Sequence, residues 1–245
     1  MSNSFFRFKR FCIHHDRCAM KVGTDGVLLG AWGSVEGKRI LDIGTGTGLI
    51  ALMAAQRNSQ AIILGIDIDE EAVLQAQENI AESPFADRVS CSLQDVAFFS
   101  PEVYYDAILC NPPFFTEDTL PNDTRRTSAR NSISLSFSLL VKKVASLLNV
   151  NGQFSVIIPY RHMQEFVSLC LSECLYLNRR CIVRTIASKP PTRVLMTFYP
   201  NLTFLHSGLS SDSLQYNLQY QELCLITDDG NKSREYIELT NDFYY

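Results

Sequence analysis

Short apolar runs alternate with amphipathic segments from residue 39 to about residue 175. The runs typical of buried strands cover residues 39–44, 61–67, 89–93, 106–111 and 153–158. Segments with the composition or periodicity of helices cover residues 49–57, 70–81, 132–148 and 160–175. Asp69 stands where it can cap the second of these helices. The alternation predicts a mostly parallel sheet with helices on both faces.

The pattern changes after residue 175, where residues 181–186 and 194–199 form two further apolar runs. The basic loop S-K-P-P-T-R between them is too short for a helical crossover, so we expect these strands to pair antiparallel. A strand-like segment, E-L-C-L-I-T, and an aromatic tail, D-F-Y-Y, come later. The strand count predicts an α/β fold with a seven-stranded, mostly parallel Rossmann-like sheet whose last strand is antiparallel.

The composition is that of an ordinary globular chain, with 245 residues, 46% hydrophobic residues and 20% charged residues. We expect one domain over residues 1–245, with residues 1–35 as an N-terminal extension that helps bind cofactor and substrate. No apolar stretch reaches the roughly 18 residues of a membrane span, and the N-terminus lacks the features of a signal peptide. The cysteines form no C-x-x-C pair and several lie in apolar runs, which favours a reducing cytoplasm. Cys170, Cys174 and His162 could form a zinc site, but their spacing fits no common template, so we expect no metal ion.

The net charge is −4, but the basic residues gather in three stretches, 1–21, 121–143 and 179–193. Acidic residues dominate residues 67–106 instead. Each basic stretch is compatible with an ordinary solvated face or with a surface that binds a polyanion. The charge distribution therefore leaves a nucleic acid partner open, which the net charge alone would not suggest.

A glycine-rich stretch, D-I-G-T-G-T-G, joins the first predicted strand to its helix. Gly44, Gly46 and Gly48 allow positive φ angles and close approach of a ligand. A tight strand-to-helix turn would explain the stretch without any ligand. Leu49 stands where the dinucleotide pattern G-x-G-x-x-G requires its third glycine, which argues against a dehydrogenase.

Two acids follow the next two strands. Asp67 ends the strand at 61–67, where a carboxylate that binds ribose hydroxyls belongs in a nucleotide-binding α/β sheet. Asp95 follows the strand at 89–93 and could accept a hydrogen bond from an adenine amino group. Because open α/β sheets bind ligands at the carboxyl ends of their strands, we expect a nucleoside site at this edge.

The fourth predicted strand ends in C-N-P-P-F-F. Asn111 offers a side-chain carbonyl, and Pro112 offers a backbone carbonyl on a chain that Pro112 and Pro113 stiffen. Two such acceptors suit a planar exocyclic amine, whose delocalised lone pair must be freed before it can attack. Phe114 can stack on the ring that carries the amine, which is worth ~1–3 kcal/mol. The alternative is a proline turn that closes the strand, with the aromatic rings in the core.

The glycine-rich stretch, the two acids and N-P-P-F together resemble the class I S-adenosylmethionine-dependent methyltransferases. In that family the sheet has seven strands, the last of them inserted antiparallel. The resemblance implies S-adenosylmethionine as the cofactor, with Asp42 and the glycines at its methionine and ribose, Asp67 at the ribose hydroxyls and Asp95 at the adenine amine. The catalytic residues that it implies are Asn111, Pro112, Pro113 and Phe114.

Segments outside these motifs resemble a narrower family, the bacterial methyltransferases that form N6-methyladenine at position 37, next to the anticodon, of a valine tRNA. The matching stretches include H-D-R-C-A-M-K-V-G-T-D-G at the N-terminus, K-P-P-T-R-V-L at 189–195 and E-L-T-N-D-F-Y at 238–244. In that family the N-terminal stretch forms part of the cofactor pocket. The cofactor site implied for this chain is Lys21, Gly23, Thr24, Asp25, Asp42, Gly44, Gly46, Gly48, Asp67, Asp95 and Asn111.

The resemblance implies the anticodon arm of a tRNA as partner. The basic residues that we expect to contact it are Arg7, Lys9, Arg10, Arg126, Arg130, Lys189 and Arg193. The motif N-P-P-aromatic also occurs in enzymes that methylate guanine in ribosomal RNA or a glutamine side chain, so these substrates stay open. A cofactor-binding module without catalysis is a further alternative, against which the intact N-P-P stretch argues.

Overall fold

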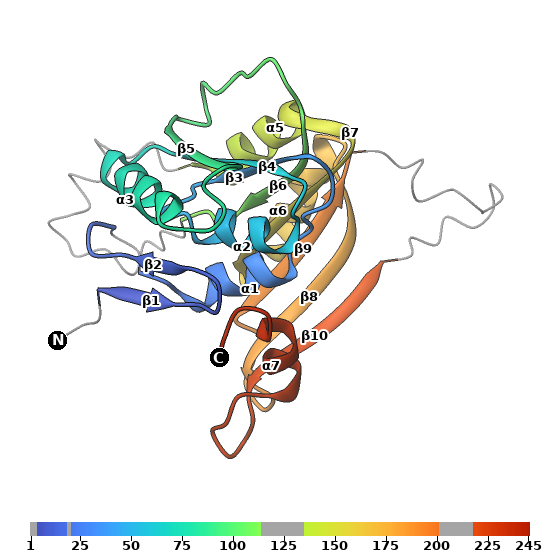
Figure 1. Ribbon diagram of the computed structural model, residues 1–245. Helices are drawn as coiled ribbons and strands as arrows, with labels where there is room; N and C mark the ends of the chain where they lie inside the picture. The colour runs from blue at the N-terminus through green and yellow to red at the C-terminus, as the bar shows by residue number, and fades with distance from the viewer. Residues whose placement is uncertain (1–3, 19–20, 114–134, 201–217) are drawn as a thin grey trace, which may run out of the picture.

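The computed structural model describes residues 4–18, 21–113, 135–200 and 218–245. Its main sheet has eight strands in the order β10-β8-β9-β7-β6-β3-β4-β5. The strands are β3 (Arg39–Ile43), β4 (Ile62–Asp67), β5 (Val89–Leu93), β6 (Tyr105–Cys110), β7 (Leu148–Pro159), β8 (Tyr176–Ile186), β9 (Arg193–Tyr199) and β10 (Gln219–Ile226). A separate two-stranded hairpin consists of β1 (Phe5–Arg7) and β2 (Cys12–His14). Figure 1 shows β8 and β10 running side by side along one end of the sheet.

The mostly parallel sheet is confirmed, and so is the antiparallel pairing of the two strands around the basic loop. Strand β9 is antiparallel to both β7 and β8, while the other neighbours in the sheet are parallel. The predicted count of seven strands is wrong, because β10 adds an eighth strand that pairs parallel with β8. The last strand of the chain is therefore parallel, and it supplies hydrogen-bond partners to the edge that β8 would otherwise expose.

The helices are α1 (Thr24–Trp32), α2 (Leu49–Arg57), α3 (Glu70–Ala81), α5 (Phe137–Leu147), α6 (Met163–Ser172) and α7 (Arg234–Thr240). The predicted cap of α3 is confirmed, since the Asp69 carboxylate accepts a hydrogen bond from Glu71 N at 3.1 Å. The helix predicted from residue 132 begins at Phe137 instead, where the Ser136 hydroxyl caps it. The helix predicted from residue 160 opens with a 3-10 turn, η2 (Tyr160–His162), which follows Pro159. No helix in the described part of the chain has the length and apolar composition to cross a membrane.

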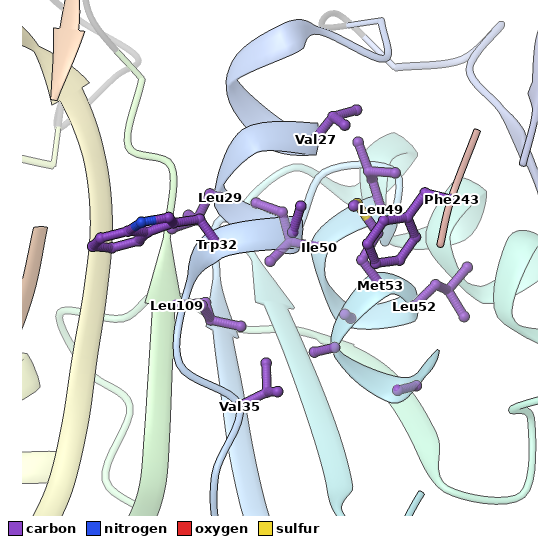
Figure 2. Close-up of a cluster of buried hydrophobic side chains, with 14 of the residues drawn as sticks. Val27, Leu29, Trp32, Val35, Leu49, Ile50, Leu52, Met53, Leu109 and Phe243 are labelled. Atoms are coloured by element: carbon purple, nitrogen blue, oxygen red, sulfur yellow. The ribbon is translucent and has the colours of Figure 1, made fainter. Parts of the chain in front are cut away.

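Two hydrophobic cores lie on the two faces of the sheet. Helices α5 and α6 cover one face, and α1, α2 and the terminal segments cover the other. Figure 2 shows Phe243 beside Leu49, Leu52 and Met53 of α2. The carboxyl-terminal residues thus complete the core on the face that carries α1 and α2.

The carboxyl end of α1 is held by two arginines from distant parts of the chain. Arg57 Nη1 donates to the carbonyls of Gly30 and Gly33, at 2.9 Å and 2.6 Å. Arg179 Nη2 donates to the carbonyl of Trp32. Cations at this end of a helix satisfy free carbonyls and oppose the helix dipole. The contacts fix α1 against α2 and β8, and so fix the direction in which its amino end points.

Candidate active site

A cavity of about 620 Å³ opens at the carboxyl ends of β3, β6 and β8, beside the amino end of α1. The N-terminal segment contributes Lys21, Val22, Gly23, Thr24, Asp25, Gly26 and Leu28 to its lining. The glycine-rich stretch and β6 contribute Gly44, Thr45, Gly46, Thr47, Leu49, Ile50 and Asn111. The far wall consists of Val183, Thr185, Thr192, Arg193, Leu225 and Ile226. The cavity therefore brings together three of the sequence features that predicted a site, namely the N-terminal stretch, the glycine loop and Asn111.

The glycine loop needs its glycines for two reasons. Gly44, Gly46 and Gly48 have φ angles of 71°, 54° and 81°, a region that other residues rarely adopt. A Cβ atom built on Gly44 or Gly46 would meet nothing within 4 Å, so the space beside these two residues is open. Gly48 caps α2 in the left-handed conformation. The loop thus presents bare backbone to open space in front of a helix N-terminus, where a ligand can approach closely.

Asp67 ties this loop to the next strand. Its carboxylate accepts hydrogen bonds from Gly46 N at 2.8 Å and from Asp69 N at 3.0 Å. Asp95 is half-buried after β5 and accepts a hydrogen bond from Ala97 N at 2.8 Å. Both acids lie at the carboxyl edge of the sheet, next to the cavity residues but outside the set that lines the cavity. The candidate site at this edge therefore consists of the cavity at the glycine loop and of two acids beside it, Asp67 at the end of β4 and Asp95 after β5.

Asp42 is fully buried beneath the glycine loop and does not line the cavity. The Thr45 hydroxyl donates to its Oδ2 at 2.6 Å, and its Oδ1 is buried as well. Burial raises the pKa of this carboxyl from 3.8 to about 7, and the negative charge of Asp67 adds to the rise. Asp42 is thus a buried acid whose protonation changes near neutral pH.

Asn111 follows the last residue of β6 and lines the cavity. Its side-chain oxygen is buried and has no hydrogen-bond partner among the residues that the structure describes. A buried carbonyl without a donor costs about 1–3 kcal/mol, so the fold keeps this acceptor at a cost in stability. Pro112 beside it is buried and Pro113 is exposed, while Phe114 lies outside the described residues. An unsatisfied acceptor in a cavity is suited to the N–H group of a ligand.

The whole chain has relatives of the same length. A Bacteroides fragilis protein named "tRNA1(Val) (adenine(37)-N6)-methyltransferase" is 43% identical over 248 aligned residues, which cover 100% of this chain and 99% of the relative. The chain belongs to the tRNA1(Val) (adenine(37)-N6)-methyltransferase family. Residues 23–169 also match the family model of the methyltransferase small domain. The family expected from the sequence motifs is therefore confirmed.

Solved structures confirm the methyltransferase fold for this tRNA1(Val) methyltransferase family member. A predicted O-methyltransferase from Agrobacterium tumefaciens aligns with a TM-score of 0.66 at 17% identity, covering 91% of this chain and 98% of that chain. A 16S rRNA N2 methyltransferase from T. thermophilus, in complex with AdoMet and guanosine, aligns with a TM-score of 0.56 at 19% identity. It covers 80% of this chain and 50% of that chain.

The basic residues that the sequence assigned to RNA occupy different places in this family member. Arg7, Lys9 and Arg10 are exposed on or after β1, and none of them lines the cavity. Lys9 Nζ donates to the Asn241 carbonyl, and the Arg10 guanidinium lies 5.2 Å from the centroid of the Phe85 ring.

The remaining basic candidates lie around the loop between β8 and β9 or outside the described residues. Lys189 is exposed on this loop, whereas Arg193 at the start of β9 lines the cavity. Arg126 and Arg130 lie outside the described residues. The structure thus separates Lys189, a surface residue at the carboxyl edge of the sheet, from Arg193, a cavity residue.

Sequence reasoning missed Asn79, which supports the site of this family member from behind. This side chain is fully buried in α3. Its Nδ2 donates to the carbonyls of Thr47 and His14, both at 2.9 Å, and its Oδ1 accepts from His14 N at 2.8 Å. Asn79 thereby joins the glycine loop to β2. The sequence does carry a signal for Asn79, because this polar residue interrupts the apolar helix face that Ala76 and Ile80 define.

Among the described residues, no group of three or more His, Cys, Asp or Glu side chains could hold a metal ion. Of the described residues that line the cavity, Lys21, Asp25 and Arg193 are charged and the others are neutral. The chemistry that this site offers is therefore hydrogen bonding, charge recognition and shape. Groups of these kinds can position bound reactants.

Proposed function

We propose that this chain transfers the methyl group of S-adenosylmethionine to the exocyclic N6 of adenine 37, next to the anticodon of a valine tRNA. Relatives that carry this activity in their names align with the chain over its full length, as in the 43% identical Bacteroides fragilis protein. The single structural observation that carries the chemistry is the buried side-chain oxygen of Asn111, a residue that lines the cavity; within the described part of the chain this oxygen has no hydrogen-bond partner.

The described residues fit a nucleoside with an amino-acid tail. The open space beside Gly44 and Gly46 leaves room for the cofactor to lie against bare backbone. In this proposal the Asp67 carboxylate accepts hydrogen bonds from ribose hydroxyls, and the Asp95 carboxylate accepts one from the adenine amine. Lys21, Gly23 and Thr24 close the cavity from the N-terminal side. When bound, S-adenosylmethionine supplies an electrophilic methyl group on a positively charged sulfur.

The target amine is held by the end of β6. Asn111 Oδ1 and the Pro112 carbonyl accept hydrogen bonds from the two N–H groups of N6, which draws the amine out of the plane of the ring and frees its lone pair for attack. The fixed φ angles of Pro112 and Pro113 keep the two acceptors in place. The proton leaves N6 after transfer, so no side chain has to act as a general base. Phe114, whose placement the structure does not describe, is proposed to stack on the base.

The adenine has to leave its stack to reach Asn111. This is easiest in a loop, where unstacking a base costs least. Lys189 on the exposed β8–β9 loop lies at the same edge of the sheet as the cavity and is proposed to contact the phosphates of the anticodon arm. We propose the same role for Arg7, Lys9, Arg10, Arg126 and Arg130.

The test uses labelled S-adenosylmethionine with two valine tRNA transcripts, one with adenine at position 37 and one with guanine there. The wild type should label only the first transcript, and nucleoside analysis should return N6-methyladenosine. Asn111→Ala should lower the rate at least about a hundredfold, since it removes one positioned partner of the reacting group. Asn149→Ala is the matched control, because Asn149 contacts Asp106 at the opposite end of the sheet.

Three outcomes would contradict parts of this proposal. Equal labelling of both transcripts would exclude adenine 37 as the target. Labelling of ribosomal RNA or of protein, with none in tRNA, would keep the chemistry and replace the substrate. Full activity of Asn111→Ala would remove Asn111 from the reaction.

A further inference from the structure

Two consecutive arginines of β8 lie on opposite faces of the sheet. Arg179 packs on Trp32 of α1, whereas the guanidinium carbon of Arg180 lies 5.1 Å from the centroid of the Tyr220 ring of β10. Side chains alternate between the two faces along a strand, and Ile182 is buried in the core that α5 and α6 cover. Arg180 therefore belongs to the face that carries α5 and α6, and Arg179 belongs to the face that carries α1.

Three cations follow one another along the first of these faces and onto the loop between β8 and β9. They are Arg180 and Arg184 of β8 and Lys189 of the loop, and we name these three residues the β8 basic track. Arg184 Nη1 donates to the Lys189 carbonyl at 2.7 Å, which joins the loop to the strand. Arg180 and Arg184 are about 13 Å apart along β8, a length over which a nucleic acid strand presents several phosphates.

The track carries more positive than negative charge. Among the described residues, Glu222 of β10 is the one carboxylate within 4.0 Å of its side-chain nitrogens, and it lies 4.0 Å from Arg184 Nε. That distance is too long for a hydrogen bond, and the same carboxylate accepts a hydrogen bond from the Tyr220 hydroxyl. The side chain of Glu222 is 52% exposed, so this part of the face is open to solvent. Three cations beside one shared carboxylate suit a polyanion.

The position of the track relative to the cavity indicates which part of an RNA would meet it. Thr185, next to Arg184, and Thr192, on the loop of Lys189, both line the cavity. The track therefore begins at the rim of the cavity and leads away from it along β8. The opposite end of the sheet, at β4 and β5, belongs to the acidic stretch 67–106, which would repel a polyanion (Figure 1).

We propose that the β8 basic track binds the backbone of the anticodon stem, while the loop of the same arm delivers its base to the cavity. This inference rests on the proposed function, because it takes tRNA as the substrate. It adds Arg180 and Arg184 to the RNA surface, and it sets the direction of the arm, from Asn111 along β8. Double-stranded RNA is recognised mostly through its shape and its backbone, which suits cations spaced along a strand.

The test measures binding of the full chain, with S-adenosylhomocysteine present, to two RNAs: the anticodon loop alone and the same loop with its stem. The double variant with Arg180→Gln and Arg184→Gln should weaken binding of the stem-loop at least about tenfold at physiological salt. It should also lower the slope of log K against log salt by about 1.6, because two phosphate contacts are lost. Binding of the loop alone should stay within about twofold of wild type. S-adenosylhomocysteine binding should not change, since neither arginine lines the cavity.

The matched control is the double variant with Lys38→Gln and Arg39→Gln, which removes two exposed charges at the amino end of β3 and should change neither affinity. Glu222→Gln removes the carboxylate beside the track and should tighten stem-loop binding about threefold. A residue that only supported the fold would not produce such a gain. If the arginine double variant does not fold, Arg184→Gln alone supplies the comparison, with a slope lower by about 0.8.

Stem-loop binding by the arginine double variant equal to that of wild type would overturn the inference and leave this face to a protein partner or to none. Equal losses for the two RNAs would overturn the assignment to the stem. A larger loss for Arg7→Gln than for the double variant would place the stem on the opposite face, beside the first hairpin. A wild type that binds S-adenosylhomocysteine but neither RNA would refute the tRNA substrate of the proposed function, and the inference with it.

Discussion

The guanidinium carbon of Arg179 lies 3.6 Å from the centroid of the Trp32 ring, and Arg179 Nη2 also donates a hydrogen bond to the Trp32 carbonyl. Trp32 is the last residue of α1, and its indole N–H donates to Gln221 of β10 at 2.7 Å. These contacts join the carboxyl end of α1 to β8 and β10. Because the amino end of α1 lines the cavity, the contacts at one end of the helix set the position of the residues at the other.

Replacing Arg179 by leucine should lower the free energy of unfolding by about 2 kcal/mol, since it removes a charged hydrogen bond and a cation–π contact. Urea denaturation measures this as a lower midpoint with an unchanged slope. Lys142→Ala on the exposed side of α5 is the control, and it should change stability by no more than about 0.5 kcal/mol. A midpoint for Arg179→Leu equal to that of wild type would show that the contact contributes nothing to stability.

Gly46→Ala and Gly230→Ala form a matched pair of variants. Comparing them distinguishes the cost of backbone strain from the effect of a methyl group in the space that the ligand would occupy. Both glycines have positive φ, 54° and 84°, and a Cβ atom at either would meet nothing within 4 Å. Each substitution should therefore cost about 1 kcal/mol of stability. Only Gly46 faces the cavity, so only Gly46→Ala should also weaken S-adenosylhomocysteine binding, by at least about tenfold or 1.4 kcal/mol. Equal binding by the two variants would place the cofactor elsewhere.

Asp42 predicts a specific pH dependence of stability. Its pKa is raised from 3.8 in the unfolded chain to about 7 in the folded protein, chiefly by burial. Between these values the folded state keeps a proton that the unfolded state releases, so stability is full below the lower pKa and falls as pH rises through about 7. The slope is at most about 1.4 kcal/mol per pH unit.

Asp42→Asn imitates the protonated carboxyl and should remove this slope. The measurement is the free energy of unfolding from pH 5 to pH 8, taken as the difference between the two proteins so that other titrating groups cancel. The variant should gain stability relative to wild type as pH rises. A constant difference across this range would show that Asp42 does not titrate there.

Lys189→Ala should weaken tRNA binding and lower the dependence of binding on salt by about one released counterion. S-adenosylhomocysteine binding should stay the same, because Lys189 does not line the cavity. Lys38→Ala is the matched control, as an exposed lysine at the other end of the sheet. Binding measured at several salt concentrations gives both quantities. An unchanged salt slope for Lys189→Ala would remove this loop from the RNA surface.

Local sequence signals predicted the elements that depend on local chemistry. The cap at Asp69 followed from its position before a helical period, and the positive φ angles of Gly44, Gly46 and Gly48 followed from the glycine spacing. The antiparallel β9 followed from a loop too short for a crossover. In each case the residues that decide the structure are neighbours in the sequence.

Features that depend on distant residues were not predictable in the same way. Arg179 belongs to a basic stretch that suggested a surface, but its guanidinium packs on the ring of Trp32, a distant residue in the sequence. Arg193 likewise pairs with Asp25, which no local pattern connects to it. Strand β10 was seen as strand-like, yet its pairing with β8 could not be inferred, because β9 and a long polar stretch separate the two strands in the sequence. Helix α1 is buried on nearly all sides, so it lacks the amphipathic period that would have identified it.

The contact between the first hairpin and the aromatic tail joins two distant parts of the sequence. The ring of Phe8 stacks on Tyr244 with centroids 5.8 Å apart, and Lys9 N donates to the Phe243 carbonyl at 2.8 Å. Phe11 packs on Phe85 as well, so the first hairpin links the aromatic tail to the segment that follows α3. A change that loosens the tail would therefore uncover the rings of Phe6 and Phe8, which pack on Tyr244. Apolar surface exposed in this way favours association between molecules.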